Sequence, residues 1–420
     1  MKKPIENKKG YKRTPLGWLP EEWGILKLIN LANGGISNGV FNDPKKIGKG
    51  YRLINVLDLY VEPHIDTSNL SRLNIGEKEF KRTQVKWGDI FFTRSSLKLQ
   101  GIARCNVNLD RSDDLTYDGH IMKISPHQDN IYPLFLKEFC NSSPARKYFM
   151  SHAKQTTMTT IGQEDIEALP VPLPALAEQR AIMSVLSTCD ATISKVQQCI
   201  IQKEIRNKWL MQQMLTGKRR LKGYGGEWKE YTYEKLFKVV KRHFDWDENK
   251  LYKLISVRRR SGGIFFREAL YGHQILVKTL RTANEGDFLF SKMQILHGAS
   301  ALVTKEFDGA KISGSYIAVV AKEAKLFNME FFQWYSQMPH FYHQTYISSY
   351  GVHIEKMTFD FEAFLQLEMK LPSIEEQTAI AQVLQSAANE IQILKIKTEQ
   401  LQEQKKGLMQ ILLTGKKRLI

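Results

Sequence analysis

Two stretches of the chain place hydrophobic residues at alternating spacings of three and four positions, a pattern typical of helices in a coiled coil. They occupy residues 174–221 and 372–419. We predict one long helix in each, with polar faces turned to solvent. The predicted seam consists of Ile182, Leu186, Ile193, Val196 and Ile200 in the first stretch, and of Ile380, Leu384, Ile391, Leu394 and Leu401 in the second.

Both predicted helices carry signals at their ends. Ser373 followed by Glu376 forms a capping box, in which side chains satisfy backbone N–H groups at the helix start. Gly217 and Gly415 stand where a residue in the left-handed conformation ends a helix. Basic residues follow each glycine and oppose the negative end of the helix dipole. At 1.5 Å per residue, about 40 residues give a rod of roughly 60 Å.

The two helical stretches are copies of one another. They align without a gap at a separation of 198 residues, and 19 of the 48 aligned positions are identical. The regions that precede them are related more weakly, as in WGDIFFTRS at 87–95 and EGDFLFSKM at 285–293. A duplication of this kind fixes the architecture before any single element is considered. We therefore expect two similar halves, with conserved helices and divergent globular parts.

The globular parts show short β-rich runs separated by loops rich in Gly, Asn, Asp and Lys. Each also contains one predicted helix, at 131–149 and at 329–346. The predicted fold class is α+β: two globular mixed α/β domains joined by two long helices that form an antiparallel coiled coil with a pseudo-two-fold axis. An alternative is that each helix packs only on its own globular domain. The predicted segments are 1–168, 169–221, 222–366 and 367–420.

Charge changes the picture, because the formal net charge is +17 and the pI is about 9.5. Such an excess of cations favours a polyanionic partner such as nucleic acid. No run approaches the roughly 18 apolar residues of a membrane-spanning helix, and the N-terminus lacks the apolar core of a signal peptide. The four cysteines have no CxxC spacing. We expect a cytoplasmic protein that contacts no membrane.

Basic and polar residues gather in the loops between the predicted strands, where Arg and Lys can neutralise phosphates or read guanine and Gln can read adenine. A solvated surface charge remains an alternative for each of them, so the cluster is more informative than its members. The candidate nucleic-acid contacts are Lys45, Lys46, Arg94, Lys98, Gln100 and Arg104 in the first domain, and Arg258, Arg259, Arg260, Lys278, Arg281, Lys292 and Gln294 in the second.

The sequence carries no recognisable catalytic motif. It lacks the phosphate-binding GxxxxGK[ST] loop, the GxGxxG dinucleotide fingerprint, the GxSxG nucleophile elbow and the [DNS]PP[YFW] motif of amino-group methylation. His340 and His343 form an isolated HxxH, for which a structural role is favoured over metal binding. We predict a chain without catalytic residues, without a metal and without a cofactor of its own.

The order of the sequence motifs, which occurs once in each half of the chain, resembles that of the specificity subunit of Type I restriction–modification enzymes. The resemblance covers nearly the whole chain: TPLGWLPEEW at 14–23, the helix starts at 169–182 and 369–380, and the two LTGK-[RK]-R-L helix ends. The second copy departs from the pattern, since GGEWKEYTYEKL at 225–236 has no proline before its tryptophan.

The resemblance implies two target-recognition domains, each reading one half of a bipartite, asymmetric site in double-stranded DNA. The helices would set the spacer and dock two methyltransferase (modification) subunits, which would carry AdoMet. Restriction subunits would supply ATP-driven translocation and cleavage. Two rival hypotheses remain: a coiled-coil tether that binds nucleic acid or an acidic protein without sequence preference, and an enzyme with an unrecognised site. Divergent domains beside conserved helices speak against the tether.

Overall fold

The computed structural model describes residues 9–353 and 357–419 of the chain. It divides into two compact units, one comprising residues 1–197 with 396–420 (unit 1) and the other residues 198–395 (unit 2). Each unit combines a globular part with sections of both long helices. We call the globular parts head 1 (residues 9–175) and head 2 (residues 222–373).

The two long helices are α5 (Leu176–Met214) and α10 (Ile374–Leu412), each of 39 residues. Gly217 and Gly415 follow them with φ values of 69° and 63°. This is the left-handed region, which suits glycine because it has no Cβ. The predicted helices and their glycine stops are confirmed.

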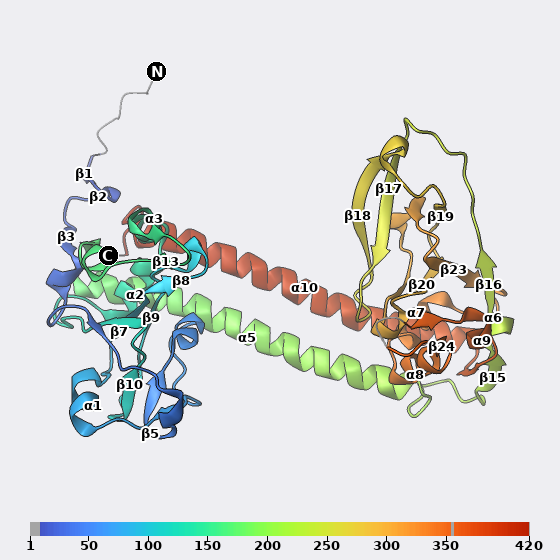
Figure 1. The fold of residues 1–420 in the computed structure, drawn as a ribbon, viewed down its shortest axis with the longest axis horizontal. Helices are drawn as coiled ribbons and strands as arrows, with labels where there is room; N and C mark the ends of the chain where they lie inside the picture. Colours follow the sequence, from blue (N-terminus) through green and yellow to red (C-terminus); the bar gives the residue numbers. More distant parts are fainter. Residues whose placement is uncertain (1–8, 354–356, 420) are drawn as a thin grey trace. The chain divides into compact units, whose positions relative to one another are not determined.

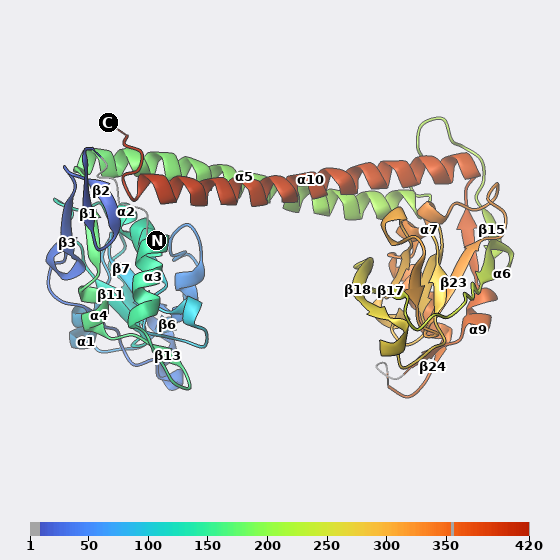
Figure 2. The same cartoon turned by 90° about the horizontal axis from the view of Figure 1, so that it is seen from above.

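Each unit contains a pair of helix sections from different copies. In unit 1 the start of α5 lies beside the end of α10 (Figures 1 and 2), where Lys405 Nζ contacts Asp190 at 2.8 Å. In unit 2 the end of α5 lies beside the start of α10, where Lys203 Nζ contacts Glu390 at 2.6 Å. The helices therefore pair antiparallel, and the alternative of helices that pack only on their own globular domain is wrong.

The predicted seam positions are all buried or half-buried. Two polar residues continue the spacing of the seam in α10: Lys405 makes an ion pair with Asp190, and Thr398 is buried. Buried seam residues are Ile182, Leu186, Ile193, Ile200, Ile380, Leu384 and Ile391, and half-buried ones are Val196, Leu394 and Leu401.

Head 1 is built around a four-stranded sheet of order β4-β11-β7-β9, formed by β4 (Ser37–Asn38), β11 (Ile121–Ile124), β7 (Ile90–Thr93) and β9 (Cys105–Val107). The β7 strand, IFFT, is buried at every position, as expected of a central strand covered on both faces. A three-stranded sheet lies beyond it, formed by β10 (Leu115–Tyr117), β5 (Ile47–Ile54) and β6 (Arg72–Leu73) (Figure 1).

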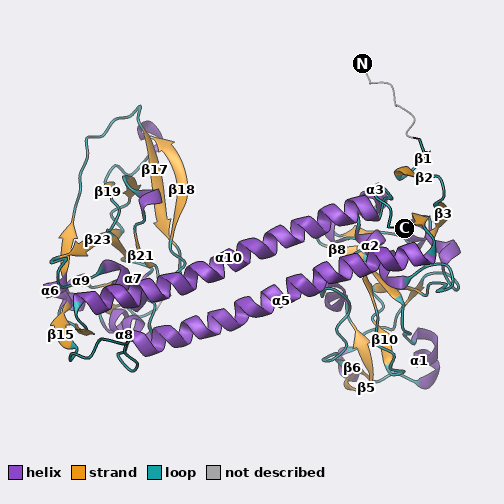
Figure 3. Ribbon diagram, turned by 180° about the vertical axis from the view of Figure 1, so that it is seen from behind, coloured by secondary structure: helices purple, strands orange, loops and turns teal. Residues whose placement is uncertain are grey.

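Head 2 repeats this order in its sheet β16-β23-β20-β21, formed by β16 (Phe237–Val240), β23 (Tyr316–Ala321), β20 (Phe288–Ser291) and β21 (Ser300–Leu302). Its second sheet, β18-β17-β22-β19, contains a long hairpin of β17 (Leu251–Val257) and β18 (Ile264–Tyr271) (Figure 3). The remaining strands of that sheet are β22 (Ala310–Ile312) and β19 (Arg281–Ala283). The two heads share a scaffold although their sequences have diverged.

The prediction of one helix in each globular domain is wrong. Head 1 has α2 (Pro133–Asn141) and α3 (Ser143–His152), and head 2 has α7 (Met329–Tyr335) and α8 (Pro339–Ile347). Pro144 and Pro339 lie in the first turns of α3 and α8, where a missing N–H costs nothing. Each proline excludes a continuous helix, because its ring clashes with the preceding turn.

In each head, a strand from the first part of the head pairs with the strand that directly precedes the long helix. In head 1, β3 (Gly24–Lys27) pairs with β14 (Pro170–Leu173), and in head 2, β15 (Lys229–Thr232) pairs with β26 (Glu368–Leu371). Leu412, the last residue of α10, and Leu413 directly after it complete the core of head 1, and Leu215, directly after α5, does so in head 2. Among the described residues, no helix combines the length and apolarity needed to cross a bilayer.

Candidate nucleic-acid interface

A buried aspartate directly precedes the central strand of each head. Asp89 accepts hydrogen bonds from Lys123 Nζ at 3.0 Å and from Ser125 Oγ at 2.6 Å. Asp287, 198 residues later, pairs with Arg242 and accepts from the backbone N–H of Asn284. A buried carboxylate requires such partners, because desolvation without them is costly. These contacts fix the strand that leads to the basic loops.

The same strand ends in each head with a cation. Arg94 follows β7 and is exposed, while Lys292 follows β20 and is half-buried. The carbonyl of Arg94 accepts from the N–H of Ile161 at 3.2 Å, and that of Lys292 accepts from the N–H of Phe359 at 3.0 Å. Lys292 lies 198 residues after Arg94, and Phe359 lies 198 residues after Ile161. The duplication has thus kept a cation, held by an equivalent backbone contact, at one position of both heads.

Head 2 has an open groove of about 860 Å³ beside this strand end. The structure brings the predicted contacts Arg281 and Lys292 together there and adds Lys241 and Tyr350, which the sequence interpretation missed. Asp360 also lines the groove, but its carboxylate accepts from the N–H of Ala363 and caps α9 (Phe361–Leu365). Glu362 is a further acidic group in the lining.

Cations of this groove match what a nucleic-acid backbone requires. Lysine and arginine side chains contact phosphates, and an exposed tyrosine offers a ring on which a base can stack and a hydroxyl that can donate to a phosphate. Tyr350 is 64% exposed. The basic run KVVKRH at 238–243 is a sequence signal for Lys241. Tyr350, in the stretch SSYG, has no such signal, because only the tertiary structure brings it to the groove.

The other candidate contacts are distributed over several loops. Arg104 pairs with Glu62, and Lys278 pairs with Glu248, so these two cations have intramolecular partners. Gln294 is half-buried beside the short η6 helix (Ile295–His297). Exposed candidates are Lys45 and Lys46 in η2 (Pro44–Lys46), Lys98 and Gln100 in the segment after β7, and Arg258, Arg259 and Arg260 in the turn between β17 and β18. Their contacts with nucleic acid stay a prediction.

A clasp of three side chains holds head 1 to the two helices. Arg418, beyond the end of α10, binds Glu178 at the start of α5 through two hydrogen bonds of 2.6 and 2.9 Å. The Trp23 indole N–H donates to the same carboxylate at 3.1 Å. The hydrogen bonds with Glu178 raise the pKa of Arg418 above its ordinary value. Because its members come from three distant segments, this clasp joins the head to both helices.

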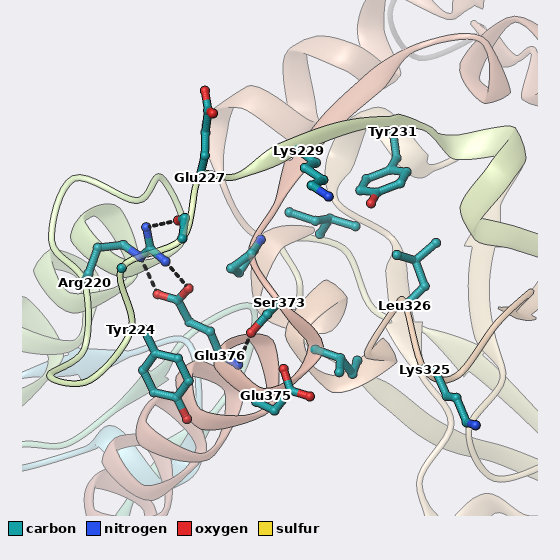
Figure 4. A pocket seen from close by; sticks show the side chains of 15 residues that line it. Arg220, Tyr224, Glu227, Lys229, Tyr231, Lys325, Leu326, Ser373, Glu375 and Glu376 are labelled. Carbon is teal, nitrogen blue, oxygen red and sulfur yellow. Dashed lines mark hydrogen bonds and ion pairs between the residues drawn. The ribbon is translucent and has the colours of Figure 1, made fainter.

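Unit 2 has an equivalent clasp (Figure 4). Arg220, beyond the end of α5, binds Glu376 at the start of α10 through two hydrogen bonds of 2.5 Å. Hydrogen bonding to Glu376 raises the pKa of Arg220. Trp228 lies with its ring centre 5.8 Å from the guanidinium, but its indole N–H has no hydrogen-bond partner among the described residues.

The clasp corrects the predicted capping box. Ser373 Oγ accepts from the N–H of Glu376 at 3.4 Å, as expected, but the Glu376 carboxylate binds Arg220 instead of reaching back to the helix start. The sequence predicts only that the basic residues after each helix oppose the helix dipole. In the structure, Arg220 and Arg418 also form specific ion pairs with glutamates. Sequence reasoning missed both pairs, since their members are 156 and 240 residues apart.

Unit 1 also contains a buried charge network beneath the head. Lys405 of α10 contacts Asp190 of α5, and Lys137 of α2 contacts both Glu138 and Glu62 at 2.8 and 2.9 Å. Burial alone would lower the pKa of Lys137, but the two glutamates hold it above its ordinary value. Asn207 in unit 2 stands at the position equivalent to Lys405, and its amide oxygen is buried without a partner in the described structure.

Comparison with known proteins gives consistent matches. Residues 21–205 match the family model described as the Type I restriction modification DNA specificity domain. The chain is 23% identical to the type I restriction enzyme MjaX specificity subunit of Methanocaldococcus jannaschii over 428 aligned residues, which cover 97% of each protein. It is 26% identical to the EcoBI specificity subunit of Escherichia coli over 215 residues, or 50% of this chain and 42% of that protein.

Solved structures show the same fold. One, from work on complex assembly and conformational transition of the type I R-M system, has a TM-score of 0.61 at 15% identity and covers 94% of this chain and 99% of its own. The Type I restriction–modification S subunit of M. genitalium has a TM-score of 0.54 at 12% identity and covers 93% of this chain and 96% of its own.

Proposed function

We propose that the chain belongs to the family of Type I restriction–modification specificity subunits and is the sequence-reading DNA-binding subunit of such a complex. Each head reads one half of a bipartite, asymmetric site in double-stranded DNA. The observation that carries this proposal is the repeated strand end: one scaffold presents Arg94 in one head and Lys292 in the other, while the loops around them differ. Identical scaffolds with different loops suit two different half-sites.

The proposal assigns chemistry to partner subunits. Two methyltransferase subunits dock on the helical parts and carry AdoMet, and restriction subunits carry ATP, while this chain binds no cofactor and catalyses no step. Two similar clasps support two equivalent docking regions, because each presents the same arrangement of helix end, helix start and tryptophan. We place the complex in the cytoplasm, where its DNA substrate lies.

Selection of DNA by the assembled complex tests this function. The full chain with its methyltransferase subunits is mixed with a pool of random duplexes, and bound DNA is separated by gel shift and sequenced. We expect one bipartite sequence with unlike halves, and an affinity that falls steeply as salt rises because phosphate contacts release counterions. Equal binding of all duplexes would support the rival tether, and methylation or cleavage by the purified chain alone would support the rival enzyme.

The helices provide the second part of the proposal, the fixed spacer between half-sites. A helical insertion near Lys203 or Asn207 changes helix length without touching either head. We expect such a variant to select the same two half-sites at a greater separation. An unchanged separation would show that helix length does not set the spacer.

A further inference from the structure

The turn between β17 and β18 in head 2 is held against a neighbouring loop. The N–H of Arg260 donates to the carbonyl of His297 at 2.6 Å, and the N–H of Ser261 donates to that of Gly298 at 2.9 Å. The Ser261 hydroxyl lies 2.7 Å from the hydroxyl of Tyr342 on α8. These three contacts fix the exposed turn. In an ordinary hairpin, a turn without such contacts is free to move.

The backbone of this turn is also strained. Arg260 and Ser261 have φ values of 58° and 53°, in the left-handed region. For residues other than glycine this conformation costs roughly 1–2 kcal/mol each. A glycine at position 260 would avoid the cost, yet the chain has a long cationic side chain there. Strain held by surrounding contacts is a reason to look for a function.

Two guanidinium groups on the turn lack acidic partners. Arg258 and Arg260 are exposed, and no carboxylate of the described residues pairs with either. The Arg258 guanidinium lies 4.9 Å from the centre of the Phe265 ring, a contact that orients it. Arg267 on β18 of the same hairpin differs, since it pairs with Glu268 at 2.6 Å.

The equivalent edge of head 1 has a different chemistry. There the loop after β5 meets the segment after β7, where the Tyr60 hydroxyl donates to the carbonyl of Gly101 at 3.5 Å. The exposed side chains at this edge include Leu57 and Leu97, with exposed fractions of 79% and 84%. Apolar side chains contact thymine methyl groups, whereas arginine forks match the paired acceptors of guanine. The two edges therefore suit different bases.

We propose that Arg258 and Arg260 read guanine in the half-site of head 2, through its O6 and N7 atoms in the major groove. This inference rests on the proposed function and adds the base and the residues. Guanine presents two adjacent acceptors there, which a guanidinium binds with two parallel hydrogen bonds. Because the backbone of the turn is fixed, the guanidinium groups can reach only a few positions. A base other than guanine therefore forms neither of the two hydrogen bonds.

The test uses the full chain assembled with its methyltransferase subunits and the bipartite duplex that it selects. Each guanine is replaced in turn by 7-deazaguanine, which still pairs with cytosine but lacks the N7 acceptor. We expect binding to fall roughly 10-fold at one or two guanines of the head 2 half-site, because the N7 hydrogen bond to a charged donor is lost while the O6 hydrogen bond remains. Arg258→Gln and Arg260→Gly should each remove the penalty at its own guanine.

Two controls separate base reading from other roles. Arg267→Gln removes the same charge from the same hairpin and should leave every 7-deazaguanine penalty unchanged. Arg260→Gly relieves the strained φ, so its melting temperature should equal or exceed that of the wild type. A loss of discrimination in a variant of undiminished stability assigns the effect to the guanidinium group.

Three outcomes would overturn the inference. If the variants weaken binding equally on all duplexes and lower the salt dependence, the arginines contact phosphates. If 7-deazaguanine has no effect in the head 2 half-site while one bipartite sequence is still selected, the reading of guanine is wrong and the proposed function stands. If the wild type selects no sequence, both fail together.

Discussion

The two units compared residue by residue share their framework and differ at their edges. Strand order, the buried aspartate, the cation at the strand end and the clasp occur in both. The exposed loop edge carries Leu57 and Leu97 beside Lys98 and Gln100 in head 1, whereas in head 2 it carries Arg258 and Arg260. The duplicated halves have thus kept their scaffold, while the exposed loop residues that could contact a ligand have diverged.

The clasps offer the sharpest contrast between the units. Glu178→Ala removes the acceptor of the Trp23 indole N–H and two hydrogen bonds of Arg418, which keeps its contact with Glu22. Glu376→Ala removes only two hydrogen bonds of Arg220, which keeps the Gly226 carbonyl. Removing one partner of a buried ion pair costs up to 3–5 kcal/mol, and partial exposure of the arginines reduces that figure. We expect losses of about 3 kcal/mol for Glu178→Ala and about 2 kcal/mol for Glu376→Ala.

Hydrogen–deuterium exchange of the core amides in each unit measures these losses. Exchange should accelerate mainly in unit 1 for the first variant and mainly in unit 2 for the second. Equal acceleration in both units for either variant would contradict the description of two separate clasps.

The glycines at the helix ends are the next contrast. A Cβ added to Gly415 would lie 2.4 Å from Pro20 Cδ, whereas one added to Gly217 would lie 3.3 Å from the nearest atom of Trp228. Both positions have positive φ, so alanine costs about 1 kcal/mol at each. Overlap with Pro20 adds about 1–2 kcal/mol at Gly415.

We therefore expect Gly415→Ala to lower the melting temperature of the chain more than Gly217→Ala. Differential scanning calorimetry on the two variants makes the comparison. A larger shift for Gly217→Ala would contradict the packing described for Pro20, the proline that the second copy lacks.

Leucine at the equivalent seam positions 207 and 405 should have opposite effects. Lys405→Leu removes the partner of Asp190 and should destabilise unit 1 by about 1 kcal/mol. Asn207→Leu replaces a buried amide oxygen that has no partner and should stabilise unit 2 by a similar amount. Urea unfolding of each variant measures the change, and effects of the same sign would contradict the contrast.

The smallest expected effects concern the cations at the strand ends. Arg94→Met and Lys292→Met each remove one charge near DNA and should lower the slope of log affinity against log salt by about 1. Affinity of the assembled complex measured at several salt concentrations gives the slope. An unchanged slope for one variant would show that its head uses other cations.

Periodic and repeated features could be predicted from the sequence, and contacts between distant segments could not. The heptad pattern and Gly217 and Gly415 predicted both helices, because each signal is local. The pairing of Glu178 with Arg418 has no local signal, since folding alone brings the two together. Pro144 marks the break before α3, but the apolar pattern continues across the proline and therefore predicts a single helix.

The candidate site divides in the same way. The sequence shows the basic loops as a cluster that includes Arg281 and Lys292, whereas only the structure shows the groove that both line. Which cations have intramolecular partners depends on tertiary structure, and Arg104 and Lys278 are paired. The strain at Arg260 likewise appears only in the backbone angles.

Sequencing of methylated adenines in cells tests the central claim most directly. Cells express the methyltransferase subunits with either this chain or a chimera in which residues 1–168 come from a relative. The account predicts that one half-site changes while the other half-site and the spacer stay the same. A simultaneous change of both half-sites would contradict the reading of DNA by two independent heads.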